Sequence, residues 1–247
     1  MRATRPTFVA GWKLGLRVIL EVIPAEYFGT NCWVLAPDKN SECIVVDPGM
    51  AIGTLVPQLR EVFDRHNLKP IAQLVTHGHL DHTFSVAPLD QAYDVPALIH
   101  PLDRPYLGDP AGLLTPGGMI DSILAQLGVG KDTFVEPSTV REVVDGEEFS
   151  IAGFTIKAIH APGHTPGSTM FLVNNEILIS GDVLFAGSIG RTDLLKGSDT
   201  QMRRTLKEKI LTLADEIEVL PGHGKETTIG FERKNNDFLS DAYLKGA

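Results

Sequence analysis

The chain has 247 residues, of which 43% are hydrophobic and 21% charged, and its formal net charge is −9. This length fits one large domain with a substantial core, and the balance of residue types is that of an ordinary soluble globular protein. The negative charge argues against a nucleic-acid surface, which normally carries a basic patch or stripe.

The sequence contains no pattern for a membrane span or an export signal. No stretch approaches the ~20 apolar residues of a membrane helix, and no apolar run near the N-terminus is long enough for a signal-peptide core. Cys32 and Cys43 are not in a CxxC pair and lie in apolar, strand-like surroundings. Buried free thiols are expected there, with a disulfide as the alternative. We expect a cytoplasmic protein without a membrane partner, and nothing in the sequence predicts its oligomeric state.

The first third of the chain predicts strands followed by a helix. Residues 1–15 show no periodicity and are expected to form a lead-in to a single domain over 16–247. Runs rich in Val, Ile, Leu and aromatic residues then predict three strands, Leu16–Ile23, Tyr27–Ala36 and Glu42–Val46. Asn31 interrupts the second strand and requires a polar partner. Asp47-Pro48-Gly49 is a turn signal, in which Asp47 either caps the turn or supports a metal-bound histidine.

The next elements alternate between helix and strand. Apolar residues at helical spacing predict a helix over Thr54–Asn67, and the apolar run 71–75 predicts a strand after it. A second helix is expected over Thr83–Tyr93, followed by a strand over 97–100. His100 ends that strand and is interpreted as a structural or surface histidine. Residues 101–138 are rich in proline and glycine, with one short helix at 121–128, and are expected to cover or flank a site.

Short strands dominate the rest of the chain. They are predicted at Val140–Val144, Phe149–Ile151, Phe154–His160, Thr169–Val173, Ile177–Ser180 and Ile217–Leu220. An amphipathic helix is expected over Thr200–Leu213, and a last helix over about 230–243. Two sheets that face one another, with helices outside, satisfy this order.

One stretch, Thr76 to His82, carries the most chemistry. His77, His79, Asp81 and His82 fall within six residues, directly after a predicted strand. Imidazole nitrogen and carboxylate oxygen are ligands for Zn²⁺ and similar divalent ions. On an extended loop, residues two apart point to the same side, so His77 and His79 are expected to converge on one metal. Asp81 and His82 follow after the chain begins to turn and are expected to face a second metal.

Three further stretches share one pattern, in which an apolar run ends, glycine follows and a metal-type ligand appears. They are Pro162-Gly163-His164, Ser180-Gly181-Asp182 and Pro221-Gly222-His223. Glycine lets the backbone approach closely and adopt positive φ, as a crowded metal pocket often requires. Four strand ends that all present ligands therefore predict one shared site.

The combination HxHxDH, GHTxGS, SGD and GH, in this order, resembles the metallo-β-lactamase superfamily from about Val18 to Glu226. The resemblance implies an α+β fold, the αββα four-layer sandwich with mixed sheets and helices outside. It also implies two divalent metal ions at one edge of the sheets, with Zn²⁺ as the default and Fe or Mn compatible with the same ligands. His77, His79 and His164 would bind the first ion, Asp81, His82 and His223 the second, and Asp182 would bridge them.

Within this superfamily the segments Gly181–Phe185 and Gly187–Asp193 look most like glyoxalase II and its short relatives. The bridging residue is Asp182, and neither cysteine is near a ligand motif, which disfavours the β-lactamases that use cysteine there. Full-length glyoxalase II continues into a C-terminal helical domain that binds glutathione, and we expect that domain to be absent here. Arg191 is expected either to hold a substrate carboxylate or to pair with Asp193, and Lys225 is a further candidate contact.

The resemblance implies a binuclear metallo-hydrolase of the hydroxyacylglutathione hydrolase type. Its small-molecule substrate would be an S-acyl thiol such as S-lactoylglutathione, attacked by a metal-bound hydroxide. Asp182 would hold the ions together and Asp81 would orient the nucleophile. The main alternative is a persulfide dioxygenase of the same fold, with one iron at His77, His164 and Asp182. A metal-binding module without turnover is a further alternative.

Overall fold

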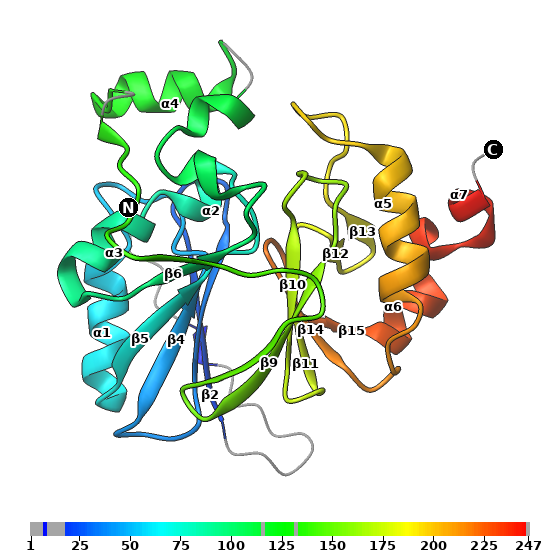
Figure 1. Ribbon diagram of the computed structural model, residues 1–247, viewed down its shortest axis with the longest axis horizontal. Coiled ribbons are helices and arrows are strands. Elements are labelled where there is room, and N and C mark those ends of the chain that lie inside the picture. Colours follow the sequence, from blue (N-terminus) through cyan, green and yellow to red (C-terminus); the bar gives the residue numbers. More distant parts are fainter. Residues whose placement is uncertain (1–6, 9–17, 115–116, 131–132, 246–247) are drawn as a thin grey trace.

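The computed structural model describes residues 7–8, 18–114, 117–130 and 133–245. Most of the predicted N-terminal lead-in lies outside these residues, but Thr7–Phe8 (β1) pair with the following strand. Two sheets face one another and helices cover their outer faces, so the predicted four-layer αββα sandwich is confirmed (Figure 1). No helix in the described ranges is long and apolar enough to cross a membrane.

The first sheet has seven strands in chain order. The strands from β2 to β4 are antiparallel, whereas β4 to β7 run parallel to one another. Their bounds are β2 (Ile19–Pro24), β3 (Asn31–Ala36), β4 (Glu42–Val46), β5 (Lys69–Leu74), β6 (Ala97–Ile99) and β7 (Val140–Glu142). The predicted second strand is shorter at its start, because Phe28 and Gly29 both have a φ of +65°, which ends an extended run.

The second sheet has six strands in the order β15-β14-β11-β10-β9-β8. Strands β9, β11 and β14 run in the same direction, because β10 is antiparallel to both β9 and β11, and β14 is parallel to β11. The bounds are β8 (Glu148–Ile151), β9 (Phe154–His160), β10 (Thr169–Val173), β11 (Ile177–Gly181), β14 (Glu218–Pro221) and β15 (Thr227–Thr228). A separate hairpin joins β12 (Leu184–Phe185) to β13 (Ser188–Ile189).

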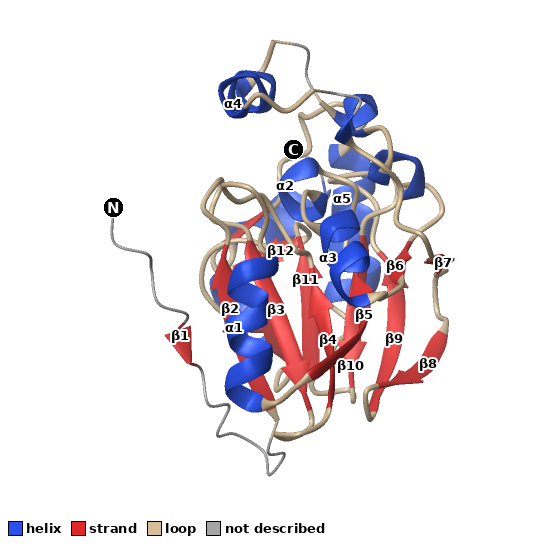
Figure 2. Cartoon of the chain, turned by 90° about the vertical axis from the view of Figure 1, so that its left-hand side faces the viewer, coloured by secondary structure: helices blue, strands red, loops and turns tan. Residues whose placement is uncertain are grey.

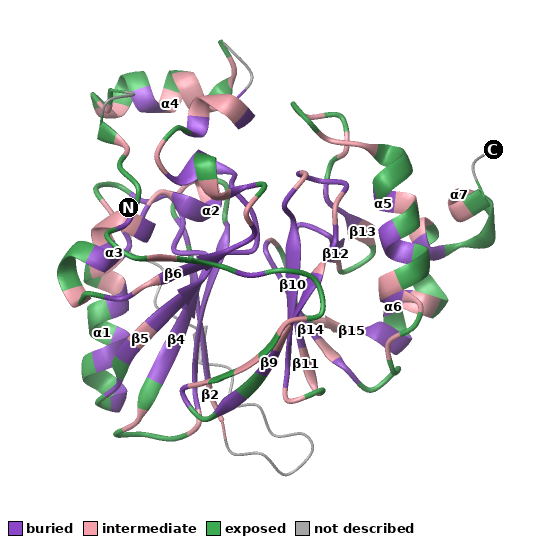
Figure 3. Cartoon of the chain, viewed as in Figure 1, coloured by how far each residue is buried: buried purple, intermediate pink, exposed green. Residues whose placement is uncertain are grey.

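The alternation of side chains along the strands produces three buried layers. In β3, Trp33 and Leu35 face the second sheet, where they meet Ile156 and Phe171, while Cys32 and Val34 face the helices. Figure 3 shows this burial concentrated in the strands, with exposed residues on the outer sides of the helices. Both cysteines are buried free thiols, as expected.

Helices α1 (Val56–His66) and α3 (Val86–Tyr93) cover the first sheet, as the view in Figure 2 also shows. The single helix predicted over Thr83–Tyr93 is instead two, because α2 (Leu80–Thr83) begins inside the histidine motif. Between them the Ser85 hydroxyl donates to the Gly49 carbonyl and accepts from the Leu55 amide, which ties the chain to the loop after β4. This anchor brings the motif against the end of β4.

Helices α5 (Asp199–Thr205) and α6 (Ile229–Asn235) cover the second sheet, and α7 (Asp241–Lys245) lies outside α5. The helix predicted over Thr200–Leu213 changes to a wider π-helical turn at Leu206–Ile210, which keeps its apolar face buried. The last predicted helix is also divided, because Asn236 adopts an extended conformation and donates its side-chain amide to the Ser188 carbonyl. The short helix α4 (Met119–Leu127) lies beyond the edge of the sheets, near α2 (Figure 1).

Candidate metal centre

Strand direction brings the predicted ligands to one edge of the molecule. The carboxyl ends of β5, β9, β11 and β14 are followed by the His77–His82 motif, His164, Asp182 and His223 respectively. Strand β3 begins at this same edge because it is antiparallel to β4. The two halves are joined there by the Thr169 amide, which donates to the Thr76 carbonyl. All seven predicted ligands therefore meet, although they come from both sheets.

The first predicted set, His77, His79 and His164, forms a compact group. One ring nitrogen from each lies within 4.8 Å of the others, and all three side chains are buried. His79 Nδ1 lies 2.8 Å from His164 Nε2. Two ring nitrogens at this distance, with a third histidine beside them, match a site at which imidazoles share one cation.

The second predicted set, Asp81, His82 and His223, also falls within 4.8 Å. The Nε2 atoms of His82 and His223 are 3.2 Å apart, and Asp81 Oδ2 lies 3.5 Å and 3.4 Å from them. Asp182 lies between the two sets. Its Oδ1 is 3.4 Å from His82 Nε2, and its Oδ2 is 3.4 Å from the Nε2 atoms of both His164 and His223. This position is suited to the predicted bridging role.

Two features of the structure test whether these residues fit a metal pair. Among the described residues, the buried atoms His77 Nε2, His79 Nε2 and Asp182 Oδ1 have no hydrogen-bond partner, and orphaned buried polar atoms are costly. In addition, a Cβ on Gly222 would lie 2.3 Å from Asp182 Oδ1, so only glycine leaves room for the carboxylate. The donor set and its unsatisfied atoms therefore fit divalent ions.

Supporting residues orient the histidines, and most of them give no signal in the sequence. His82 Nδ1 donates to Asp47 Oδ2 at 2.9 Å, so Asp47 supports a histidine rather than capping a turn. His164 Nδ1 donates to the Arg191 backbone carbonyl at 2.7 Å. Thr76 Oγ1 contacts His77 Nδ1 and donates to Asp47. Thr30 Oγ1 donates to Asp81 Oδ2 at 3.0 Å.

Asn31 has the partner that the sequence required. Its side-chain amide donates to the carbonyls of Pro221 and Gly224, which flank His223. His100, by contrast, lies outside the cluster. It is buried and stacks on His160, with ring centroids 4.1 Å apart, and is a structural rather than a surface histidine.

The two sets differ in how the side chains alone would titrate. Burial lowers the pKa of His77 well below its ordinary value and that of His79 to about 3. Burial also opposes the charged form of His82, but the carboxylates of Asp182 and Asp81 outweigh it and hold its pKa well above the ordinary value. His77 and His79 are therefore neutral ligands at pH 7, whereas His82 carries a proton.

His223 and Asp81 follow the same logic. Burial opposes the charge on His223, but hydrogen bonds to Asp182 and Asp81 raise its pKa to about 9. Burial also opposes the Asp81 carboxylate, but His82 and His223 lower its pKa to about 2. An ion that binds to Asp81, His82 and His223 must displace imidazole protons, whereas an ion that binds to His77 and His79 displaces none.

We therefore expect Zn²⁺ binding at pH 7.5 to release about two protons from His82 and His223. The sign follows from the raised pKa values of His82 and His223, since the competing protons are bound at neutral pH, and the proton on His223 is lost as the pH rises through about 9. As the pH falls, the ion beside these two histidines should dissociate first. Titration of metal into weakly buffered protein with a pH indicator measures the release, and His223→Gln should reduce it by about one proton. Metal binding that releases no protons between pH 6 and 8 would contradict the assignment.

Gly222→Ala should weaken metal binding without unfolding the protein. The new Cβ would lie 2.3 Å from Asp182 Oδ1 and 2.7 Å from His82 Cε1, so both side chains must move. We expect a loss of about 1–3 kcal/mol in unfolding free energy from overpacking, and metal affinity lower by about 10–100-fold. Metal content and thermal unfolding measure the two effects. Gly130→Ala is the matched control, because its Cβ would meet only Thr133 Oγ1 at 4.0 Å. Equal metal affinity in the two variants would refute the close approach.

A cavity of about 560 Å³ opens over the cluster. His79, Asp81, His164, Asp182 and His223 form its polar floor. Arg191 also lines it, but its guanidinium is paired with Asp193 through two contacts of 2.9 Å, as the alternative interpretation expected. Lys225 is exposed and is not among the residues that line the cavity. Contacts of either residue with a substrate remain predictions.

One family model matches most of this chain, and several curated proteins are similar to it over nearly their whole length. The family model described as "Metallo-beta-lactamase superfamily" matches residues 26–223. An uncharacterized protein of Mycobacterium tuberculosis is 41% identical over 230 residues, covering 90% of this chain and 98% of its own length. "Probable metallo-hydrolase YqgX" of Bacillus subtilis is 32% identical, covering 88% of this chain and 96% of its own length. "Hydroxyacylglutathione hydrolase GloC" of Haemophilus influenzae is 32% identical, covering 90% and 98%.

Solved structures show the same fold. The BLEG-1 B3 metallo-beta-lactamase is 33% identical, with a TM-score of 0.76, covering 90% of this chain and 100% of that one. TTHA1623, solved in a di-iron-bound form, is 31% identical with a TM-score of 0.64, covering 95% and 99%. ETHE1 from Myxococcus xanthus has a TM-score of 0.70, covering 92% of this chain and 87% of that one. At 19% identity it shows the fold alone.

Proposed function

The chain belongs to the metallo-β-lactamase superfamily, and on that premise we propose that it is a metal-dependent hydrolase that cleaves S-acyl thiols. One observation carries this proposal. Seven histidine and aspartate side chains from both sheets converge in two sets with Asp182 between them, and five of the seven line one cavity. Two divalent ions held there, with Zn²⁺ as the default, would polarise a carbonyl and supply an ionised water at neutral pH.

The side chains of the chain itself position the reactants. Asp81 is ionised, lines the cavity and is held by the Thr30 hydroxyl, so it can accept a hydrogen bond from the attacking water and orient it. The water gives up a proton as its oxygen bonds to the acyl carbon, the carbon–sulfur bond breaks, and the thiolate takes up a proton, so that a carboxylic acid and a thiol leave. Asp182 holds the two sets of histidines at a fixed separation. No serine or cysteine nucleophile is required, and both cysteines lie in the hydrophobic layer beneath the helices.

The thioester as substrate is supported by two likenesses to one class of enzyme. The Gly181–Phe185 and Gly187–Asp193 segments resemble glyoxalase II, and the similar protein of H. influenzae is named a hydroxyacylglutathione hydrolase. S-lactoylglutathione or a related S-acyl thiol is therefore the first candidate. β-Lactams should also be tested as substrates, because a similar solved structure is named a B3 metallo-beta-lactamase.

The second candidate is persulfide oxidation with one iron at His77, His164 and Asp182. Gly190 to Asp193 resembles that family, and a face of two histidines and one carboxylate suits oxygen chemistry. Iron content and oxygen uptake separate it from the hydrolase. A metal-binding module without turnover is the third candidate, and it would bind ions but act on none of the substrates.

The test is the loss of thioester absorbance from S-lactoylglutathione and from simpler acyl thiols, on protein of known metal content, with and without a chelator. Chelator-sensitive hydrolysis with two ions per chain is the expected result. One iron per chain with oxygen uptake on a persulfide, and no thioester turnover, would replace the hydrolase by the dioxygenase. Turnover of β-lactams alone would move the substrate class and keep the hydrolase.

A further inference from the structure

The walls of the cavity differ sharply from its floor. On one side they are formed by Phe28, Leu113, Leu114, Met119 and Ile120, and on the other by Phe185, Ile189 and Leu194. These apolar residues come from the loop before β3, the segment leading into α4, the β12–β13 hairpin and the loop after it. Three stretches of the chain that are distant in sequence thus place apolar side chains above one polar cluster.

Two of these residues are exposed where burial would be expected. Met119 is 69% and Phe28 is 39% exposed, and both are large apolar side chains that line the cavity. Helix α4, which carries Met119, lies at the edge of the molecule and is mostly exposed or half-buried (Figure 3). Exposed apolar residues that gather around a cavity indicate a surface that is covered by a ligand.

Phe28 adds a second, independent observation. Its φ of +65° lies in the left-handed region, which bulky residues rarely adopt. Such conformations persist where the surrounding structure enforces them, and they concentrate at ligand sites. This backbone turn places an aromatic ring on the cavity wall rather than in the core.

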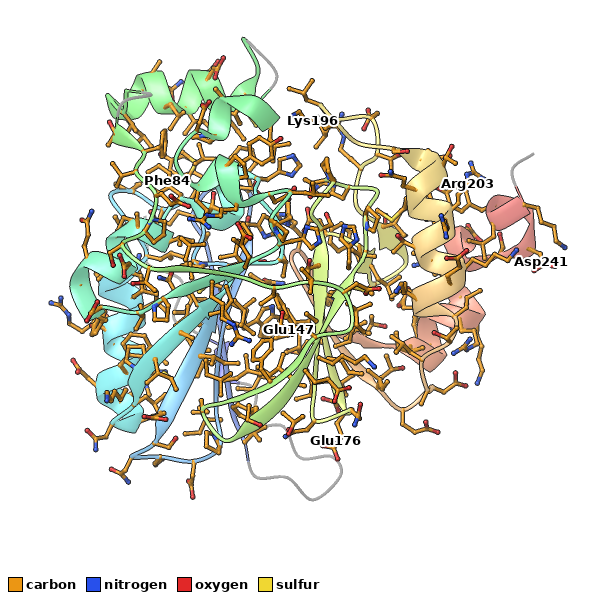
Figure 4. The ribbon with its side chains drawn as sticks, viewed as in Figure 1. Phe84, Glu147, Glu176, Lys196, Arg203 and Asp241 are labelled. Carbon is orange, nitrogen blue, oxygen red and sulfur yellow. The ribbon has the colours of Figure 1, made fainter. Side chains whose placement is uncertain are left out.

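The cavity holds little positive charge for an anionic carrier. Arg191 is the single Lys or Arg side chain among the described residues that line it, and Asp193 already pairs with the Nε–Nη2 edge of its guanidinium. Lys196, on the following loop (Figure 4), donates to the Tyr106 hydroxyl. The chain as a whole carries a net charge of −9. Two glutathione carboxylates would therefore meet no uncommitted cation here.

We propose that the substrate is a thioester with an apolar chain of several carbons, which lies between the α4 side and the β12–β13 side of the cavity. This inference rests on the proposed thioester hydrolase and names the substrate class of the same site. The apolar chain belongs either to the acyl group or to the thiol, because both groups attached to the scissile bond would extend from the polar floor of the cavity along its walls. The chemistry of recognition is the same in both cases, namely transfer of methylene groups from water to an apolar wall.

The experiment uses the full chain loaded with Zn²⁺ and measures kcat/KM by thiol release. One arm varies the acyl group on N-acetylcysteamine from acetyl through butyryl to hexanoyl. The other arm compares S-hexyl thioacetate with S-acetyl-N-acetylcysteamine and S-acetylglutathione. In the arm whose apolar chain lies on the same side of the scissile bond as in the natural substrate, we expect kcat/KM to rise about two- to fourfold per methylene. S-acetylglutathione should be the poorest acetyl thioester.

Two variants of similar exposure localise the effect. Met119→Ser should reduce the preference for hexanoyl over acetyl by about tenfold, because it removes apolar surface from the wall. Phe231→Ser, on α6, changes a side chain that is 56% exposed and does not line the cavity, so the preference should not change. Equal effects of the two variants would contradict the location.

A binding measurement separates the two proposals. S-hexyl-N-acetylcysteamine, a thioether that cannot be hydrolysed, should bind at least about tenfold more tightly by calorimetry than its S-methyl counterpart. Hydrolysis that is flat or declines with acyl length in the first arm, together with no preference for S-hexyl thioacetate in the second, would overturn the apolar substrate and leave the hydrolase standing. Tighter binding of the hexyl thioether without turnover of any thioester would overturn the hydrolase, and with it the thioester as the apolar ligand.

Discussion

Asp182→Ala should leave fewer than two metal ions per chain and reduce thioester hydrolysis by about a thousandfold, roughly 4 kcal/mol in activation free energy. Among the described residues, Asp182 is the one carboxylate whose two oxygens face both sets of histidines, at 3.4 Å from His82, His164 and His223. Its removal takes away the anion that both halves share. It also removes the first carboxylate that supports the protonated form of His82, so the pKa of that ring should fall.

Metal content by mass spectrometry tests this prediction independently of activity. Asp182→Asn retains the shape but not the charge, and it should also lose metal, which separates an electrostatic effect from a cavity. The matched control is Asp241→Asn, the same change on α7 at an 87% exposed side chain that pairs with Lys245 (Figure 4). An Asp182→Ala protein that retains two ions would refute the bridging role.

Asp103→Asn should lower the unfolding free energy by about 2–4 kcal/mol and the metal affinity by about 10–100-fold. Asp103 is fully buried in the loop after β6. Its Oδ2 accepts from the Gly78 amide at 2.9 Å and the Thr165 hydroxyl at 2.5 Å, and its Oδ1 accepts from the Gly167 amide at 2.7 Å. One carboxylate thus joins the loop of His77 and His79 to the loop of His164, across the two sheets.

An asparagine at position 103 must place its NH₂ group against a donor, because both carboxylate oxygens accept from N–H or O–H groups. The two loops should then separate, and His77, His79 and His164 should no longer point toward one common position. Asp109→Asn in the same segment is the control, because its exposed side chain accepts only from the Ala111 amide and asparagine can do the same. Thermal unfolding and metal affinity are measured separately. Normal metal affinity in a destabilised Asp103→Asn protein would limit Asp103 to a role in folding.

The sequence predicted the strands of the core well because their signal is local. Glu42–Val46, Phe154–His160 and Thr169–Val173 have the predicted bounds, since a short apolar run or an apolar–polar alternation of this length has few alternatives to a strand. Helix ends were less predictable. Ser85 divides the helix predicted over Thr83–Tyr93 through hydrogen bonds to Gly49 and Leu55, more than 25 residues away in sequence. A local pattern contains no information about such partners.

The candidate ligands were predicted by residue type, but their supporting residues were not. His77, His79, Asp81 and His82 are recognisable because four metal-type side chains follow one strand. Asp47 was ambiguous, and the hydrogen bond to His82 decides between its two interpretations. Asp103, Thr30 and the Arg191 carbonyl gave no signal, because a lone aspartate, threonine or peptide group is common in any loop.

The sequence by itself therefore determined which side chains can bind metal, and the alternation that buries the two sheets against each other. Only the tertiary structure decided which ligands face one another and that Asp182 lies between the two sets. It alone also decided that three distant segments form an apolar wall over them. The physical reason is that side-chain chemistry and periodicity are properties of neighbouring residues. Distances across the site depend instead on how two twisted sheets pack, which is a property of the whole core.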